Sequence, residues 1–109
     1  MEDTENTVST GAEVRYTPDP VVVAWGELDV ATVPVLESAL DSVLNLHGGR
    51  AVEVDLSGVS FIDSSGLGVL VTGLKRAQEH GGTLIVRGLQ PSPRKVFEIT
   101  GLLELFQTD

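Results

Sequence analysis

The chain has 109 residues, which is enough for one domain with a single hydrophobic core. Sixteen acidic residues against seven Lys and Arg residues give a formal net charge of -9, which excludes nucleic acid and anionic membranes as main ligands, because clustered basic side chains hold both. The absence of cysteine excludes disulfides, thiolate metal sites and cysteine nucleophiles.

The chain opens on a polar, acidic stretch, and we expect residues 1–10 to form a disordered leader before a single domain over residues 11–109. This start has no secretory signal and no apolar run approaches the roughly 20 residues of a membrane span, so we expect a cytoplasmic protein. Weak alternation over residues 13–16 and the β-branched residues at 21–25 predict two strands. The turn signal at residues 17–20 predicts that these strands form a hairpin.

Two amphipathic helices follow, with a strand over residues 51–56 between them. Thr32 or Asp29 can cap the first helix, and His47 precedes the two glycines that end it. The second helix is the stronger one and spans residues 64–80. The apolar stripes that predict these helices consist of Leu36, Ala39, Leu40, Val43 and Leu44 in the first, and of Leu67, Leu70, Val71, Leu74 and Ala77 in the second.

In the last part of the chain, residues 83–87 predict a strand, and Pro91 opens a third helix that Gly101 ends. Residues 102–106 form a short apolar run whose type the pattern leaves open. Strands that alternate with helices predict an α/β domain. We expect a mixed β-sheet of four to five strands with helices packed on it, mixed because of the opening hairpin.

Common catalytic and ligand-binding motifs are absent. His47 and His80 each stand beside glycine at a helix end. A cation is favourable near a helix C-terminus, and this accounts for both histidines without a metal site. Gly66 and Gly68 lack the third glycine of a dinucleotide-binding loop, because Val71 takes its place. There is no Walker A loop and no nucleophile elbow. We therefore expect no catalytic residue, no metal site, no cofactor and no enzyme activity.

The start of the second helix departs from ordinary design. Asp63, Ser64 and Ser65 are all residues that cap helices, and one of them has that structural role. Gly66 and Gly68 each destabilise a helix by roughly 0.8–1 kcal/mol relative to alanine. Either tight internal packing or close approach of a partner explains them, and the sequence leaves both open.

A modified serine is physically favourable at this position, because a helix N-terminus attracts anions. A phosphate there adds about -1.5 to -2 charges. Asp63, and Asp29 through the fold, would repel it and limit its stabilisation. We expect such a phosphate to alter recognition more than folding.

The motif DSSGLG at residues 63–68, with residues 54–62 before it, resembles the STAS domains of bacterial anti-sigma factor antagonists. The segment GELD at residues 26–29 is similar to a second element of that family, as are the two glycines before residue 83 and the segment 100–102. The resemblance extends over about residues 12–107. It implies a STAS-like fold and a regulatory role without catalysis by this chain.

The resemblance also implies a switch. Family members bind an anti-sigma factor that is also a serine kinase, and this binding frees a sigma factor for transcription. The kinase phosphorylates the first serine of the motif, here Ser64, and a PP2C-type phosphatase restores binding. Asp29 matches an acidic loop position near that serine. The residues expected to contact the partner are Glu27, Leu28, Asp29, Asp63, Ser65, Gly66, Leu67, Gly68 and Val71, whereas Leu70 and Leu74 are assigned to the core.

Family members usually carry a further C-terminal helix after the last strand, and we expect this final helix to be missing here. Residues 102–106 would then leave an apolar edge open to a partner or a second copy. We expect the chain to be a monomer or a weak dimer.

Two other functions stay open: a non-switching STAS scaffold, in a signalling assembly or as an accessory to a lipid transporter, and a small nucleotide-binding module.

Overall fold

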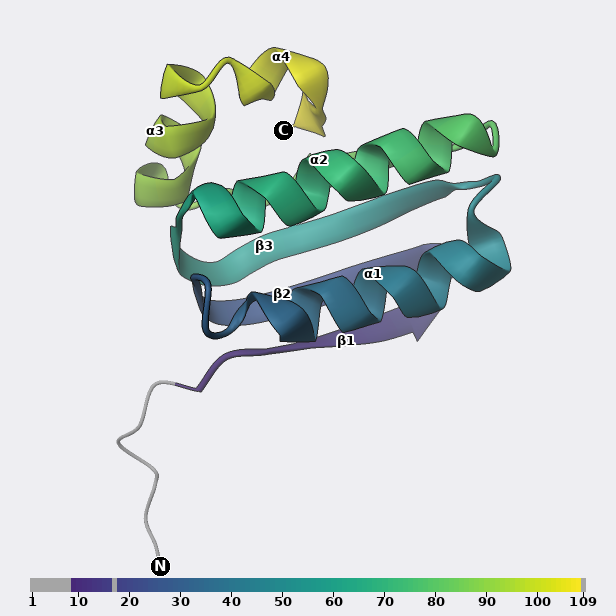
Figure 1. Ribbon diagram of the computed structural model, residues 1–109, viewed down its shortest axis with the longest axis horizontal. Helices are drawn as coiled ribbons and strands as arrows, with labels where there is room; N and C mark the ends of the chain where they lie inside the picture. The colour runs from purple at the N-terminus through teal and green to yellow at the C-terminus, as the bar shows by residue number, and fades with distance from the viewer. Residues whose placement is uncertain (1–8, 17, 109) are drawn as a thin grey trace, which may run out of the picture.

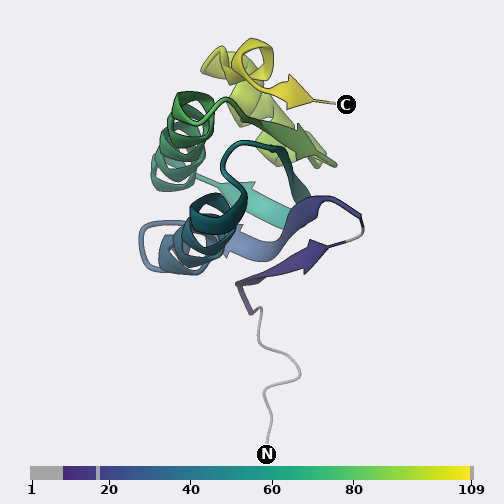
Figure 2. The ribbon, with the colours of Figure 1, turned by 90° about the vertical axis from the view of Figure 1, so that its right-hand side faces the viewer.

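The computed structural model describes residues 9–16 and 18–108. In Figures 1 and 2, α1 and α2 lie side by side over one face of a β-sheet, while α3 and α4 lie together above α2. No helix in the described part of the chain is both long and apolar enough to cross a membrane. The elements follow in the order β1 (Gly11–Tyr16), β2 (Pro20–Leu28), α1 (Val33–His47), β3 (Ala51–Ile62), α2 (Ser64–Glu79), β4 (Thr83–Arg87), α3 (Pro91–Ile99), α4 (Leu102–Leu105) and β5 (Gln107–Thr108).

The sheet has five strands in the spatial order β1-β2-β3-β4-β5. β1 and β2 form the predicted antiparallel hairpin, in which Tyr16 pairs with Pro20. The pairs β2–β3, β3–β4 and β4–β5 are parallel, and a helix lies in each of these connections. The predicted mixed α/β domain is therefore confirmed.

β2 and β3 extend well beyond the predicted segments, and β1 begins two residues before its predicted start. β3 continues through Ser57 and Gly58, which resemble a turn in sequence, as far as Ile62. Glycine at residue 58 lets β3 pass close to β2, because a Cβ on Gly58 would lie 2.9 Å from the Cβ of Trp25 on β2. β2 continues through Gly26, whose φ of 95° is one that glycine adopts readily. As a result the ends of β2 and β3 run together, with residues 27 and 28 paired to residues 61 and 62.

The hydrophobic core lies between the sheet and the helices that cover it. The five residues of the first predicted apolar stripe are all buried in α1. Leu70 and Leu74 of α2 are 0% and 2% exposed, which confirms their assignment to the core. Val71 is only half-buried. No polar or charged side chain is buried among the described residues, so apolar burial holds the layers together.

The apolar run at residues 102–106 forms the one-turn helix α4 and leads into the short edge strand β5. Gly101, with a φ of 77°, turns the chain between α3 and α4. Phe106 is 2% exposed and its ring meets that of Phe97 at a centroid distance of 5.9 Å, whereas Leu105 is 49% exposed. The expected apolar edge is therefore partly covered from within. No helix follows β5 within the described residues.

The expected leader falls largely on residues 1–8, which lie outside the described residues. Thr10 is described, and its hydroxyl both donates to the carbonyl of Glu27 and accepts from the N–H of Glu27, each at 3.1 Å. The residue just before β1 is thus tied to the last part of β2.

Candidate functional site

Asp63 is the residue that caps α2. Its Oδ1 accepts hydrogen bonds from the N–H groups of Ser65 at 2.8 Å and of Gly66 at 3.4 Å. Its own N–H donates to the carbonyl of Leu28 at 3.1 Å. The carboxylate therefore occupies the N-terminal amides of α2, while the backbone fixes this helix start to the end of β2.

Ser64 is the first residue of α2 and is exposed. Its hydroxyl makes no hydrogen bond to any described residue, and Ser65 beside it is half-buried. Of the two serines, Ser64 thus has the hydroxyl that a modifying enzyme can reach more easily.

The two glycines of the motif have different roles. A Cβ on Gly66 would lie 2.6 Å and 2.9 Å from Cγ1 and Cδ1 of Ile62, and 3.3 Å from the Cβ of Leu28. At Gly68 there is nothing within 4 Å of the same position, and the residue is exposed. Gly66 therefore satisfies an internal packing need, while Gly68 leaves open surface in the second turn of the helix.

The loop after β2 is closed by its own hydrogen bonds. Oδ1 of Asp29 accepts from the N–H groups of Ala31 and Thr32, each at 3.0 Å. The Thr32 hydroxyl donates to the carbonyl of Glu27 at 2.6 Å and accepts from the N–H of Asp29 at 3.0 Å. Thr32 stands at the N-cap position of α1 without a side-chain bond into that helix. These contacts fix the shape of the acidic loop, and the bond from the Asp63 N–H to the Leu28 carbonyl joins its start to the start of α2.

Several expected contact residues gather at this end of the molecule, but three of them are buried, Gly66 and two leucines. Glu27 and Gly68 are exposed, whereas Leu28 is 0% and Leu67 is 6% exposed. These two leucines belong to the core, because β2 turns one towards the helices and α2 turns the other towards the sheet. Their side chains support the surface rather than form it.

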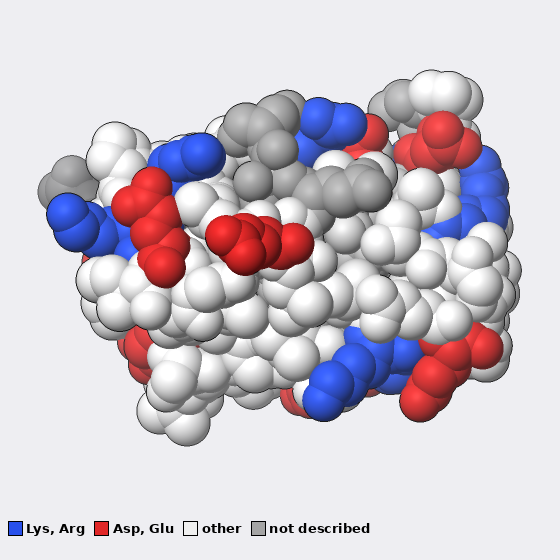
Figure 3. All heavy atoms as spheres, turned by 90° about the horizontal axis from the view of Figure 1, so that it is seen from above, with Lys and Arg blue, Asp and Glu red and all other residues white. Residues whose placement is uncertain are grey.

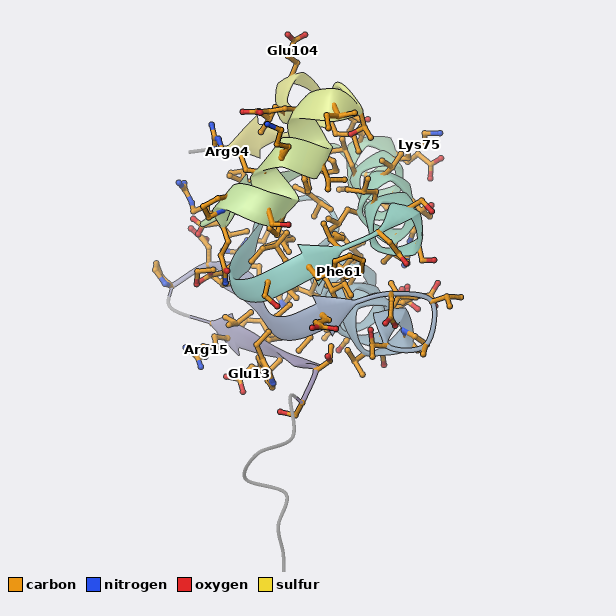
Figure 4. All side chains as sticks on the ribbon, turned by 90° about the vertical axis from the view of Figure 1, so that its left-hand side faces the viewer. Glu13, Arg15, Phe61, Lys75, Arg94 and Glu104 are labelled. Atoms are coloured by element: carbon orange, nitrogen blue, oxygen red, sulfur yellow. The ribbon has the colours of Figure 1, made fainter. Side chains whose placement is uncertain are left out.

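Two apolar residues that the sequence analysis missed are exposed here. Phe61 is 44% exposed and Val30 is 76% exposed. Figure 4 shows Phe61 near the centre of this end of the molecule. Val30 could have been found, because an aliphatic residue in a polar turn is unusual. Phe61 could not, because the strand pattern does not say which of Phe61 and Ile62 faces outward.

A groove runs from the two serines along the junction of α1 and α2. Arg76 lines its far end, where it forms an ion pair with Asp41 and donates to Oδ1 of Asn45 at 3.2 Å. The other lining residues are Glu37 and Leu40 on α1, and Ser64, Ser65, Gly68, Val69, Thr72 and Gly73 on α2.

The charged side chain that lines the groove nearest the serines is that of Glu37. Three more acidic residues lie outside its lining, at the end of β2, in the loop after it and at the start of α2: Glu27, Asp29 and Asp63. The basic residues of α2 begin at Lys75, about 16 Å further along the helix axis from Ser64. Figure 3, seen from the side of α3 and α4, shows acidic and basic side chains in clusters with uncharged surface between them. Among the described residues, no group of three or more possible metal ligands lies together.

Comparisons with known proteins agree with this fold and site. The family model described as "Mlab, STAS domain" matches residues 13–107. The anti-sigma-B factor antagonist of Staphylococcus aureus (strain NCTC 8325 / PS 47) is 40% identical over 88 residues, which are 81% of each chain. The anti-sigma-B factor antagonist of Listeria monocytogenes is 37% identical over 100 residues, 92% of this chain and 87% of that protein. The crystal structure of an anti-sigma factor antagonist from Mycobacterium paratuberculosis matches with a TM-score of 0.76 and 30% identity, covering 95% of this chain and 86% of that one.

The fold, the DSSGLG helix start and these relatives agree on one class of protein. That class is a regulatory α/β domain with a mixed sheet and two helices on one face. The chain belongs to the STAS-domain family of anti-sigma factor antagonists.

Proposed function

We propose that this chain binds an anti-sigma factor with serine kinase activity and thereby releases a sigma factor for transcription. The observation that carries the proposal is the exposed hydroxyl of Ser64, unbonded within the described residues, at a helix start with open surface at Gly68. The two curated relatives at 40% and 37% identity are both anti-sigma-B factor antagonists, which supports it. The proposed setting is the cytoplasm, and the proposed form is a monomer or weak dimer.

The contact surface of the proposal combines an apolar centre with an acidic rim. Phe61 and Val30 supply exposed apolar area, and Glu27 lies beside them on the neighbouring strand end. Val71, half-buried on α2, lies one helical turn beyond Leu67. Apolar anchors surrounded by polar residues are the usual composition of a protein–protein interface.

Phosphorylation of Ser64 is the proposed off-switch. The kinase transfers the γ-phosphoryl group of ATP: a P–O bond to Ser64 Oγ forms, the bond to the β-phosphate oxygen breaks, the serine proton passes to a base of the kinase, and ADP is left. Transfer requires the serine to lie against the nucleotide, so the phosphoserine then faces the anionic ADP. The N–H groups of Ser65 and Gly66 cannot compensate the new charge, because Asp63 already uses them. Repulsion and burial of an unpaired dianion therefore release the partner. A PP2C-type phosphatase restores the hydroxyl by hydrolysis.

The test is binding and phosphorylation with the purified anti-sigma kinase of the same organism. Ser64→Ala should bind with ADP and Mg²⁺ present but gain no phosphate by intact mass, and Ser64→Asp should bind at least about tenfold more weakly. Ser65→Ala is the matched control and should still be phosphorylated. A phosphate that persists in Ser64→Ala would remove Ser64 from this role.

A second candidate is a non-switching STAS scaffold or transporter accessory, which is compatible with the matching family model because that model describes a STAS domain and no switch. Binding to a partner that is the same for wild type, Ser64→Ala and Ser64→Asp would select this function. The nucleotide-binding alternative finds no support, since the carboxylate of Asp63 occupies the helix N–H groups that a phosphate ligand would use.

A further inference from the structure

The groove between α1 and α2 has one feature that internal packing does not explain. Gly68 borders the groove, weakens α2, and has nothing within 4 Å of the position of a Cβ. Gly73, further along the same groove, is different, because its Cβ would lie 3.2 Å from Cδ1 of the core residue Leu84. Gly68 is therefore a surface glycine, a residue type that allows the backbone of another chain to approach a helix closely.

The charge of the groove is unbalanced near Gly68. At the far end Arg76 neutralises Asp41. On the opposite wall, Glu37 of α1 is exposed and forms no ion pair with any described residue. The groove thus presents the carboxylate of Glu37, without an ion-pair partner among the described residues, close to the open surface at Gly68 and to the two serines.

We infer that this groove receives a segment of the anti-sigma factor in which a Lys or Arg side chain pairs with Glu37 while the segment packs on Gly68. The inference rests on the proposed function and adds to it the part of the surface that selects the partner. A basic segment complements the carboxylates at this end, and association with a chain of net charge -9 favours it at long range. Glu37 is then a specificity residue, and Gly68 sets how closely the segment can approach.

Calorimetric titration with the purified anti-sigma kinase of the same organism, with ADP and Mg²⁺ present, tests the inference. Glu37→Lys should weaken binding about tenfold or more, and Glu37→Gln by a smaller factor, because the first creates repulsion and the second only removes attraction. Glu79→Lys carries the same charge change at the exposed far end of α2 and should stay within about twofold of wild type.

Gly68→Leu tests the steric part separately. It should reduce binding by about tenfold or more while leaving the thermal unfolding temperature no lower than that of wild type, since the space around Gly68 is open. Weak binding together with a lowered unfolding temperature would count against the inference.

The outcomes distinguish a failure of the groove inference from a failure of the proposed function. If Ser64→Asp abolishes binding but Glu37→Lys and Gly68→Leu bind as wild type does, the groove inference is wrong and the proposed function stands. If the wild-type chain does not bind the kinase at all, both are wrong.

Discussion

Gly66 and Gly68 are two residues apart in one helix, and their surroundings differ in kind. Adding a methyl group at residue 66 forces it against Ile62 and Leu28, and overpacking of this type typically destabilises by about 1–3 kcal/mol. At residue 68 the same methyl group meets nothing. Of the two explanations that the sequence leaves open, internal packing therefore holds for Gly66, and open surface is what surrounds Gly68.

Gly66→Ala should lower the free energy of unfolding by about 1 kcal/mol, because the clash exceeds the gain in helix propensity. Gly68→Ala should raise it by up to about 1 kcal/mol. Urea denaturation followed by circular dichroism measures both, and each variant controls for the other. Stabilisation by both substitutions to the same degree would contradict the packing of Gly66 on Ile62.

Asp63→Ala should lower the free energy of unfolding by about 1 kcal/mol, because the N–H groups of Ser65 and Gly66 lose their acceptor. Asp63→Asn should recover most of this stability, since an amide oxygen can accept the same bonds. The control is Ser64→Ala, which removes no hydrogen bond to a described residue and should change stability by less than about 0.5 kcal/mol. Equal losses in the two alanine variants would show that Asp63 does not act as the cap.

At the scale of the elements, the last segment of the chain has a single fully buried side chain among those that the structure describes. The four residues of α4 include no buried side chain, and β5 is two residues long, so neither can hold itself in place. Phe106, between them, is buried against Phe97 of α3. Leu102 and Leu103 of α4 also pack against the core while partly buried, so Phe106 is the one fully buried anchor among the described side chains of this segment.

Phe106→Ala should lower the free energy of unfolding by about 3 kcal/mol or more, as expected for loss of a buried phenylalanine. Leu105→Ala changes a neighbouring residue that is 49% exposed and should have an effect below about 1 kcal/mol. Thermal unfolding followed by circular dichroism distinguishes the two. A similar small effect in both variants would mean that the segment is not docked as described.

Periodicity alone was enough to predict the helices, because α1 buries its whole predicted stripe and α2 buries all of its stripe except the half-buried Val71. β4 was predicted with its observed bounds, whereas β1, β2 and β3 were predicted too short. Gly26 and Gly58 signal turns when read locally, yet both lie inside strands, since β2 and β3 approach closely where Trp25 crosses Gly58. A contact between strands that are about 30 residues apart in sequence leaves no mark in a local pattern.

The site was predictable in its polar part and less so in its apolar part. The DSSGLG segment predicted a capping residue at the start of α2 without selecting one of three candidates, because capping residues act locally, and the structure identifies Asp63. Leu28 and Leu67 were expected at the surface but lie in the core, and Phe61 was not expected there but is exposed. Which of two adjacent apolar residues faces inward depends on the twist and register shifts of the sheet.

For the whole molecule, the net charge of -9 and the acidic rim around Ser64 predict how a basic partner associates. Raising sodium chloride from about 50 mM to about 500 mM should slow association with the anti-sigma kinase about tenfold and change dissociation much less, because screening shortens long-range attraction. Stopped-flow mixing measures both rates, with a neutral osmolyte of equal viscosity as the control. An association rate that does not depend on salt would contradict a basic partner surface.

The face of the sheet turned away from α1 and α2 has a practical consequence. Trp25 is the chain's single tryptophan, and its ring lies against Gly11 of β1, while Val22 and Ala24 on the same strand point into the core. Its fluorescence should therefore change when β1 and β3 separate from β2, yet it is shielded from events on α2 by the sheet itself. The fluorescence of Trp25 therefore reports unfolding in each variant above, and a partner that docks at Ser64 should leave this fluorescence unchanged.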